Sequence, residues 1–259
     1  MPILEAIVLG IVQGLAEFLP ISSSGHLILV PWLFGWESLA DNPDLNRSFD
    51  VALHVGTFAG AFAYFRKDIA RIVVGVLSSI RHRRIETDQQ RLAWLLVIAS
   101  LPAATIGFVL DSVLNVDRAS PWSIAVMLIV FGVVLALADR LRGARSIETF
   151  DVRSALLMGF AQAAALQPGV SRSGATISMG RFLRFDRDAA VRISFLMSLP
   201  ITAGAGLYKG LDVLTEGGVP ADFVPAFIWG MVTAAITGWV AVWGTLRLIR
   251  TRSFMPFVV

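Results

Sequence analysis

The sequence predicts an all-α polytopic membrane protein, built as an inverted-topology repeat with two re-entrant helical hairpins and five to six transmembrane helices. Composition supports the membrane class, because 56% of the 259 residues are hydrophobic and only 16% are charged, whereas soluble domains carry about 25% charged residues. The hairpins are indicated by two long apolar regions, 3–36 and 154–180, which proline and a polar run each interrupt.

Composition also excludes several kinds of site. The chain contains no cysteine, which rules out a disulfide framework, a thiolate metal site and a cysteine nucleophile. A mean hydropathy of +0.71 is too high for a disordered chain. A sequence pI near 9.9 would indicate a nucleic-acid partner only if the basic residues shared one surface. The positions of the charges along the chain decide whether this interpretation holds.

Five uninterrupted apolar stretches are candidate spans, since a membrane-spanning helix needs about 20 mostly apolar residues. They are 49–65, 92–110, 121–138, 193–208 and 223–246.

The charges between the spans form two alternating classes. Four basic segments carry a net charge of +10 together, and they are 66–91, 139–153, 181–192 and 247–252. Three acidic segments carry −6, and they are 37–50, 111–118 and 209–222. Because basic loops stay cytoplasmic, this alternation takes each clear span across the membrane once and leaves no basic surface for nucleic acid. It makes the first interrupted region enter and leave from the outer side, and the second from the inner side.

The two interrupted regions match at a constant offset of 149 residues. The matched pairs are Gly10 with Gly159, Gln13 with Gln162, Ser22 with Ser171, Ser24 with Ser173, and Gly25 with Gly174. Copies that enter from opposite sides form an inverted repeat, whose broken tips meet near the midplane and line a cavity. A pair of kinked spanning helices is the alternative, and it explains the prolines but not the matched polar residues.

We therefore expect a single membrane domain over 1–259, with repeat one at 1–139 and repeat two at 152–259. A span rich in small residues follows each hairpin, and small residues let helices approach closely. These residues are Gly56 and Gly60 in the first repeat, and Ala203, Gly204 and Gly206 in the second.

The two interrupted regions contain three charged residues, Glu5, Glu17 and Arg172, and of these Glu17 and Arg172 lie next to the polar runs. A charge at the centre of a membrane helix costs roughly 2.5–3.5 kcal/mol on insertion scales, so such residues are candidates for function. The alternative is a buried ion pair that only holds the tips together, which leaves the surrounding serines unexplained.

Ser22, Ser23 and Ser24 follow Pro20 and precede an apolar run, which predicts that a helix starts here. The first turn of a helix offers unpaired N–H groups and a positive dipole end that suit phosphate. For Ser22 alone we favour an ordinary N-cap. His26 lies three residues beyond Ser23, so the two share a helix face and form a candidate nucleophile and base.

The second tip reads Ser171-Arg172-Ser173-Gly174. An arginine binds phosphate through a planar fork, so this tip is interpreted as an oxyanion clamp that faces the first tip. Asp50 and His54, spaced i and i+4, are interpreted as a helix cap, with a supporting or metal-binding role as the alternative.

Two stretches together resemble the undecaprenyl-diphosphate phosphatases of bacteria, also called bacitracin-resistance proteins. The first runs from Gln13 to His26 and reads Q-G-L-A-E-F-L-P-I-S-S-S-G-H; the second runs from Pro168 to Thr176 and reads P-G-V-S-R-S-G-A-T. The resemblance covers nearly the whole chain, and the two motifs together are highly specific.

The resemblance implies hydrolysis of undecaprenyl diphosphate to the monophosphate carrier of cell-wall synthesis. It implies a multi-pass protein of the bacterial plasma membrane with six spans and a site open to the outer face. The partners would be a polyprenyl diphosphate substrate and membrane lipids, with a homodimer left open.

The resemblance also assigns roles at the site. Ser23 would be the nucleophile, His26 the acid/base, Glu17 the acidic residue and Arg172 the group that holds the diphosphate. A magnesium or calcium ion would bind at Glu17. The candidate substrate-binding residues around them are Gln13, Ser22, Ser24, Ser171, Ser173 and Gly174.

Two features depart from the family. Many relatives have a second acid where this chain has Gln13, which can only form hydrogen bonds. Relatives also continue into a final spanning helix where this sequence has residues 254–259. Five complete spans are therefore counted rather than six, and either the sequence is truncated or the last helix is absent.

The rival function is a transporter or flippase for a polyprenyl phosphate or a small anion, because inverted repeats with broken helices are typical of transporters. The combination of Ser23, His26, Glu17 and Arg172 favours chemistry, since transport needs charge pairing but no nucleophile.

Overall fold

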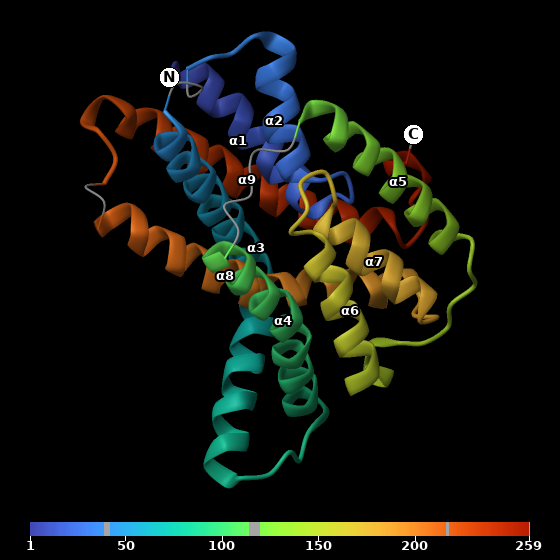
Figure 1. Ribbon diagram of the computed structural model, residues 1–259. Helices are drawn as coiled ribbons and strands as arrows, with labels where there is room; N and C mark the ends of the chain where they lie inside the picture. The colour runs from blue at the N-terminus through green and yellow to red at the C-terminus, as the bar shows by residue number, and fades with distance from the viewer. Residues whose placement is uncertain (39–41, 114–119, 216–217, 259) are drawn as a thin grey trace.

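The computed structural model describes residues 1–38, 42–113, 120–215 and 218–258, and within these ranges the regular structure is entirely helical (Figure 1). The longer helices are α1 (Ile3–Phe18), α2 (Ser23–Phe34), α3 (Pro43–His82), α4 (Asp88–Val113), α5 (Pro121–Asp139), α6 (Val152–Ala164), α7 (Arg172–Phe182), α8 (Arg187–Thr215) and α9 (Val224–Leu248). Three short 3-10 turns complete them: η1 (Ile147–Thr149), η2 (Ala221–Phe223) and η3 (Met255–Phe257). The prediction of an all-helical fold is confirmed.

The first apolar region is broken between α1 and α2. Leu19 is extended, as expected for a residue that precedes proline, and this ends α1. Ser22 has a left-handed φ of 68°, and its Oγ accepts a hydrogen bond from Gly25 N at 3.4 Å. Ser22 is therefore the N-cap of α2, as predicted.

The second apolar region is broken in the same way between α6 and α7. Gly169 has a φ of +90°, a conformation that favours glycine. Ser171 is the N-cap of α7, and its Oγ accepts from Gly174 N at 3.0 Å. The matched serines Ser22 and Ser171 thus cap the two second helices alike.

Each pair of helices turns back on itself, and the two tips meet in the centre of the molecule (Figure 1). The α1–α2 pair reaches the centre from the top of the view, and the α6–α7 pair from below and from the right. The longest of these four helices, α1, has 16 residues, which extend about 24 Å at 1.5 Å per residue. That is short of the roughly 30 Å hydrocarbon core of a bilayer.

Among the residues that the structure describes, four helical stretches are long and apolar enough to cross a membrane, namely 88–110, 121–139, 187–211 and 221–248. They agree with four of the five expected spans. The fifth, 49–65, is not among them; it lies inside the 40-residue α3, where Asp50 and His54 lower the apolar character. The expected outer segments 37–50, 111–118 and 209–222 each fall partly outside the described residues.

The two hairpins pack in corresponding ways. Helices α1 and α3 lie against α9, whereas α6 and α8 lie against α4. A Cβ atom on Gly10 would overlap the carbonyl oxygen of Gly230, and one on Gly159 would lie 2.5 Å from the carbonyl oxygen of Ala99. Each matched glycine therefore brings its helix into backbone contact with a helix from the other half of the chain.

The expected close packing of small residues is found in one span and not in the other. Gly56 and Gly60 of α3 face the carbonyl oxygens of Met231 and Ala235 of α9 without room for a Cβ atom. Gly204 of α8, in contrast, would have no other atom within 4 Å of a Cβ. The expectation for Gly204 was wrong, because no neighbouring backbone approaches this part of α8.

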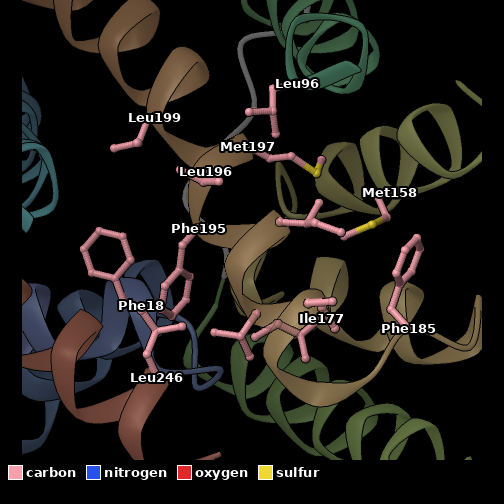
Figure 2. Packing of buried hydrophobic residues seen from close by; sticks show 14 of the residues in the cluster. Phe18, Leu96, Met158, Ile177, Phe185, Phe195, Leu196, Met197, Leu199 and Leu246 are labelled. Atoms are coloured by element: carbon pink, nitrogen blue, oxygen red, sulfur yellow. The ribbon is translucent and has the colours of Figure 1, made fainter. Parts of the chain in front are cut away.

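A hydrophobic cluster lies beneath the two tips (Figure 2). Phe18 at the end of α1 meets Phe195 of α8 edge to face, with ring centroids 5.3 Å apart. Ile177 of α7 and Leu246 of α9 complete this part of the cluster. Because Phe18 follows Glu17 and Ile177 lies in the helix that Arg172 begins, this packing fixes the positions of both charged residues.

Candidate active site

The centre of the site is an ion pair between the two hairpins. The Arg172 Nη2 atom donates to Glu17 Oε1 at 2.6 Å, and the Glu17 side chain is only 7% exposed. Glu17 lies at the end of α1 and Arg172 is the first residue of α7. The two intramembrane charges identified in the sequence are therefore direct partners.

The other oxygen of the Glu17 carboxylate accepts two hydrogen bonds from the first hairpin. The Ser23 hydroxyl donates to Oε2 at 2.5 Å, and Gln13 Nε2 donates to the same atom at 3.0 Å. The predicted nucleophile thus already bonds to a group that can take its proton. Gln13 contributes a hydrogen bond to this carboxylate, in keeping with an uncharged amide that can only form hydrogen bonds.

Arg172 also bonds to α8, which the sequence did not indicate. Its Nη1 atom donates to the hydroxyl of Thr202 at 2.7 Å and to the carbonyl oxygen of Ser198 at 3.3 Å. A threonine on an apolar helix carries no distinct pattern, so only the packing of α7 against α8 identifies Thr202.

The two tips touch through backbone atoms. The Ser173 hydroxyl donates to the carbonyl oxygen of Leu19 at 3.0 Å. A Cβ atom on Gly25 would lie 3.6 Å from the Cα atom of Gly169, and one on Gly174 would lie 3.5 Å from the carbonyl oxygen of Pro20. The glycines that the repeat matches let the start of each helix approach the opposite tip.

His26 is oriented by its own helix. Its Nδ1 atom lies 2.8 Å from the carbonyl oxygen of Ser22; a carbonyl only accepts, so Nδ1 carries the proton and neutral His26 keeps an accepting Nε2. The hydrogen bond of Ser23 goes to Glu17 rather than to His26. The acid/base role of His26 stays a prediction.

His54 is the imidazole that lies beside Glu17. Its Nε2 atom is 3.7 Å from Glu17 Oε2, and its Nδ1 atom lies 2.7 Å from the carbonyl oxygen of Asp50. Interpreting Asp50 and His54 as a helix cap was wrong, because α3 begins at Pro43 and Asn42 is its cap. The alternative weighed from the i, i+4 spacing, a supporting role at the site, agrees with this position.

Burial separates the candidate residues into two groups. Ser23, Ser24, His26, His54 and Arg172 are partly exposed, so a substrate can reach them.

The other group is buried: Gln13, Ser22, Ser171, Ser173 and Gly174. The buried serines bond within the protein, where Ser171 and Ser173 hydroxyls lie 3.2 Å apart and Ser22 and Ser24 hydroxyls 3.4 Å apart. Their predicted part in substrate binding stays a prediction.

The second hairpin does not repeat the acid. Glu17 corresponds to Leu166 at the 149-residue offset. Gln162, the counterpart of Gln13, is 3% exposed, and neither atom of its amide has a hydrogen-bond partner among the described residues. Only the first hairpin supplies a carboxylate to the site.

The donor set does not by itself form a cation site. Among the described residues there is no group of three or more acidic or histidine side chains that could hold a metal ion. Both Glu17 oxygens already accept from Arg172, Ser23 and Gln13. Magnesium and calcium prefer several oxygen ligands, so no catalytic step is assigned to a metal here.

These features define a helical membrane protein with a buried polar site where two interrupted helices meet. The particular family follows from sequence comparison: residues 6–259 match the family model of the bacitracin resistance protein BacA. The chain belongs to this family.

Curated relatives share the full length of the chain. The undecaprenyl-diphosphatase of Pelobacter propionicus is 45% identical over 260 residues, which cover 100% of this chain and 93% of the relative. That of Geobacter sulfurreducens is 46% identical over 260 residues, covering 100% and 94%. That of Hahella chejuensis is 40% identical over 256 residues, covering 99% and 93%. The family predicted from the two motifs is confirmed.

Proposed function

We propose that this protein hydrolyses undecaprenyl diphosphate to undecaprenyl phosphate and inorganic phosphate. Full-length relatives at 40–46% identity are named for this reaction. The observation that carries the proposal is that Ser23 and Arg172 bond to the same carboxylate, one through each oxygen. A hydroxyl, a proton acceptor and a fixed cation then stand together where a phosphoryl group can be held.

In the first step the Ser23 Oγ atom attacks the terminal phosphorus of the diphosphate. The bond from that phosphorus to the bridging oxygen breaks, and undecaprenyl phosphate leaves with the electron pair. The Ser23 proton passes to Glu17 Oε2, 2.5 Å away. This leaves a phosphoserine and a neutral Glu17.

Protonation of Glu17 changes the electrostatic environment of Arg172. The guanidinium loses its anionic partner at 2.6 Å, so its charge becomes available to the phosphoryl oxygens. Stabilisation of the charge spread over those oxygens is the main catalytic device in phosphoryl transfer. Thr202 keeps the guanidinium in place through Nη1.

In the second step a water molecule attacks the phosphoserine. His26 Nε2 accepts a proton from this water, the bond from phosphorus to Ser23 Oγ breaks, and Oγ regains its proton from Glu17. Inorganic phosphate leaves, and His26 releases its proton to solvent. One water is consumed for each diphosphate that is split.

We place the protein in the bacterial plasma membrane, with re-entrant hairpins and a site open to the outer face. The short hairpin helices and the separation of +10 from −6 along the chain support this arrangement. A divalent cation belongs to the proposal only as an ion that enters with the diphosphate, and turnover measured in chelator tests that part.

The deciding experiment measures phosphate release from undecaprenyl diphosphate in detergent, with wild type and Arg172→Ala side by side. We expect turnover by the wild type and at least a 100-fold loss in the variant, since removal of one oxyanion donor typically costs 10²–10³ in rate. If the folded wild type releases no phosphate, a transporter or flippase becomes the better-supported function.

A further inference from the structure

A cavity separate from the candidate active site lies where α5, α7 and α9 end and α8 begins. Its volume is about 560 Å³, and the ends of α5 and α7 that border it lie at the right of Figure 1. Five arginines and three aspartates line it: Arg140, Arg142, Arg181, Arg187, Arg250, Asp139, Asp186 and Asp188. None of the candidate active-site residues is among its lining residues.

The three aspartates are all engaged. Asp139 accepts from Arg187 through both oxygens, at 2.7 and 3.1 Å, and from the backbone N–H of Phe254 at 3.0 Å. Asp188 accepts from Arg250 at 3.3 Å. Asp186 accepts from the N–H of Ala189 in the first turn of α8. Five arginines against three aspartates leave the lining with a net charge of +2, and the aspartates form their hydrogen bonds with Arg187, Arg250 and backbone N–H groups.

The remaining arginines offer unused donors. Arg181 is only 4% exposed, and its Nη atoms bond to the carbonyl oxygens of Phe185 and Leu141. Its Nε atom is buried without a hydrogen-bond partner, 4.0 Å from Asp139 Oδ1. The side chains of Arg140 and Arg142 are exposed and, within the part of the chain that the structure describes, form no hydrogen bond or ion pair.

The wall of the cavity is preformed. Arg145 N–H donates to the carbonyl oxygen of Arg184 at 3.0 Å, and Asp186 N–H donates to that of Arg145 at 2.9 Å. Gly143 lies so close to the carbonyl oxygen of Phe185 that a Cβ atom would not fit. The segment that carries Arg140 and Arg142 is thus tied to the turn between α7 and α8, so a ligand would not have to order it.

We propose that this cavity binds the phosphate group of an anionic molecule, at a site distinct from the one that splits diphosphate. Two free guanidinium groups beside a buried, unpaired N–H match the oxygens of phosphate. The cavity lies at the basic end of the helices, which the positive-inside rule assigns to the cytoplasm. Basic pockets between membrane helices on that side bind anionic headgroups, and free phosphate presents the same chemistry.

The test compares full-length wild type with Arg140→Gln/Arg142→Gln, two exposed positions whose change breaks no bond. Arg81→Gln/Arg84→Gln removes the same charge from two exposed positions at the C-terminal end of α3 and just beyond it and is the matched control. Native mass spectrometry reports bound phosphatidylglycerol against phosphatidylcholine. Calorimetry with inorganic phosphate tests the free anion.

We expect Arg140→Gln/Arg142→Gln to bind at least fivefold less phosphatidylglycerol or inorganic phosphate than Arg81→Gln/Arg84→Gln. Loss of phosphatidylglycerol alone assigns the site to a lipid headgroup, and loss of phosphate binding assigns it to the free anion. Equal binding by wild type and both variants, or an equal loss in both variants, overturns the proposal. Because binding is read without turnover, the outcome is independent of whether diphosphate is the substrate, and elution as a single folded species validates each variant.

Discussion

Ser23 and Arg172 donate to the two oxygens of one carboxylate, although 149 residues separate them. The Ser23 hydroxyl bonds to Glu17 Oε2 at 2.5 Å and the Arg172 Nη2 atom to Oε1 at 2.6 Å. Each is the first residue of the second helix in its hairpin, so the two occupy equivalent positions of the repeat. At this position the repeat has a hydroxyl in one copy and a cation in the other, just as Glu17 of the first copy corresponds to Leu166 of the second.

The fork of Arg172 is expected to be required beyond its charge. Arg172→Lys keeps a positive charge but loses the planar fork whose two Nη atoms bond to Glu17 and to Thr202 and Ser198 on different sides. We expect kcat/KM for phosphate release to fall by about 100-fold. Arg153→Lys, at an exposed position, is the matched control and should behave like wild type. If Arg172→Lys showed wild-type kinetics, the positive charge alone would be sufficient and the fork would not be required.

The ion pair is also expected to contribute to stability. Glu17→Gln leaves the Arg172 guanidinium, 20% exposed, without its carboxylate, which should cost roughly 3 kcal/mol. Glu17→Gln/Arg172→Gln removes both charges and should recover part of this loss. Thermal unfolding in detergent ranks the stabilities of the wild type, the single variant and the double variant. As a control, Asp188→Asn breaks an exposed pair and should leave the unfolding temperature unchanged. If the double variant were less stable than Glu17→Gln, the unpaired Arg172 charge would not be the cause of the lost stability.

The two histidines should differ in their effect on turnover. His26→Gln removes the proposed base of the second step and should lower kcat by roughly 10²–10⁴. His54→Gln should cost no more than about fivefold, because His54 lies 3.7 Å from Glu17 with a side chain 37% exposed, and even a charged pair with such exposure contributes up to ~1 kcal/mol. Phosphate release under saturating substrate measures both. The reverse order would move the acid/base role from His26 to His54.

Glycine positions should separate close helix contacts from open ones. Gly10→Ala places a methyl group against the backbone of Gly230 and the hydroxyl of Thr233, and such overpacking costs typically 1–3 kcal/mol. Gly204→Ala meets no atom within 4 Å and should be neutral or slightly stabilising, since alanine is the better helix former. Unfolding temperatures of the two variants check this, and equal values would place α1 farther from α9 than described.

The two ends of α3 should lie on opposite sides of the membrane. Its 40 residues extend about 60 Å at 1.5 Å per residue, twice the hydrocarbon thickness. Because the chain contains no cysteine, Asp44→Cys and Arg84→Cys can be labelled without background by an impermeant maleimide. We expect Asp44→Cys to react from outside intact plasma membranes and Arg84→Cys only after they are permeabilised. Reaction of both from one side would contradict the charge-based orientation.

Much of the fold could be predicted from local properties of the chain. Apolar length indicated five spans, of which four are long and apolar enough in the described structure; proline and a polar run indicated both interruptions, and Ser22 was predicted as a cap. The apolar stretch 49–65 falls short of the hydropathy that four other helices reach, because Asp50 and His54 make this part of α3 less apolar. That it spans the membrane stays a prediction from its apolar length and from the alternation of charge.

Residue types and repeat positions were enough to predict that Glu17, Ser23 and Arg172 share one site. Only the tertiary structure decided how they connect: Ser23 bonds to Glu17, His54 lies beside that carboxylate, and Thr202 holds Arg172. The reason is physical. A cap or an interruption depends on residues a few positions apart, whereas the partner of a buried charge is set by which helices pack across the bundle, and no local pattern encodes that choice.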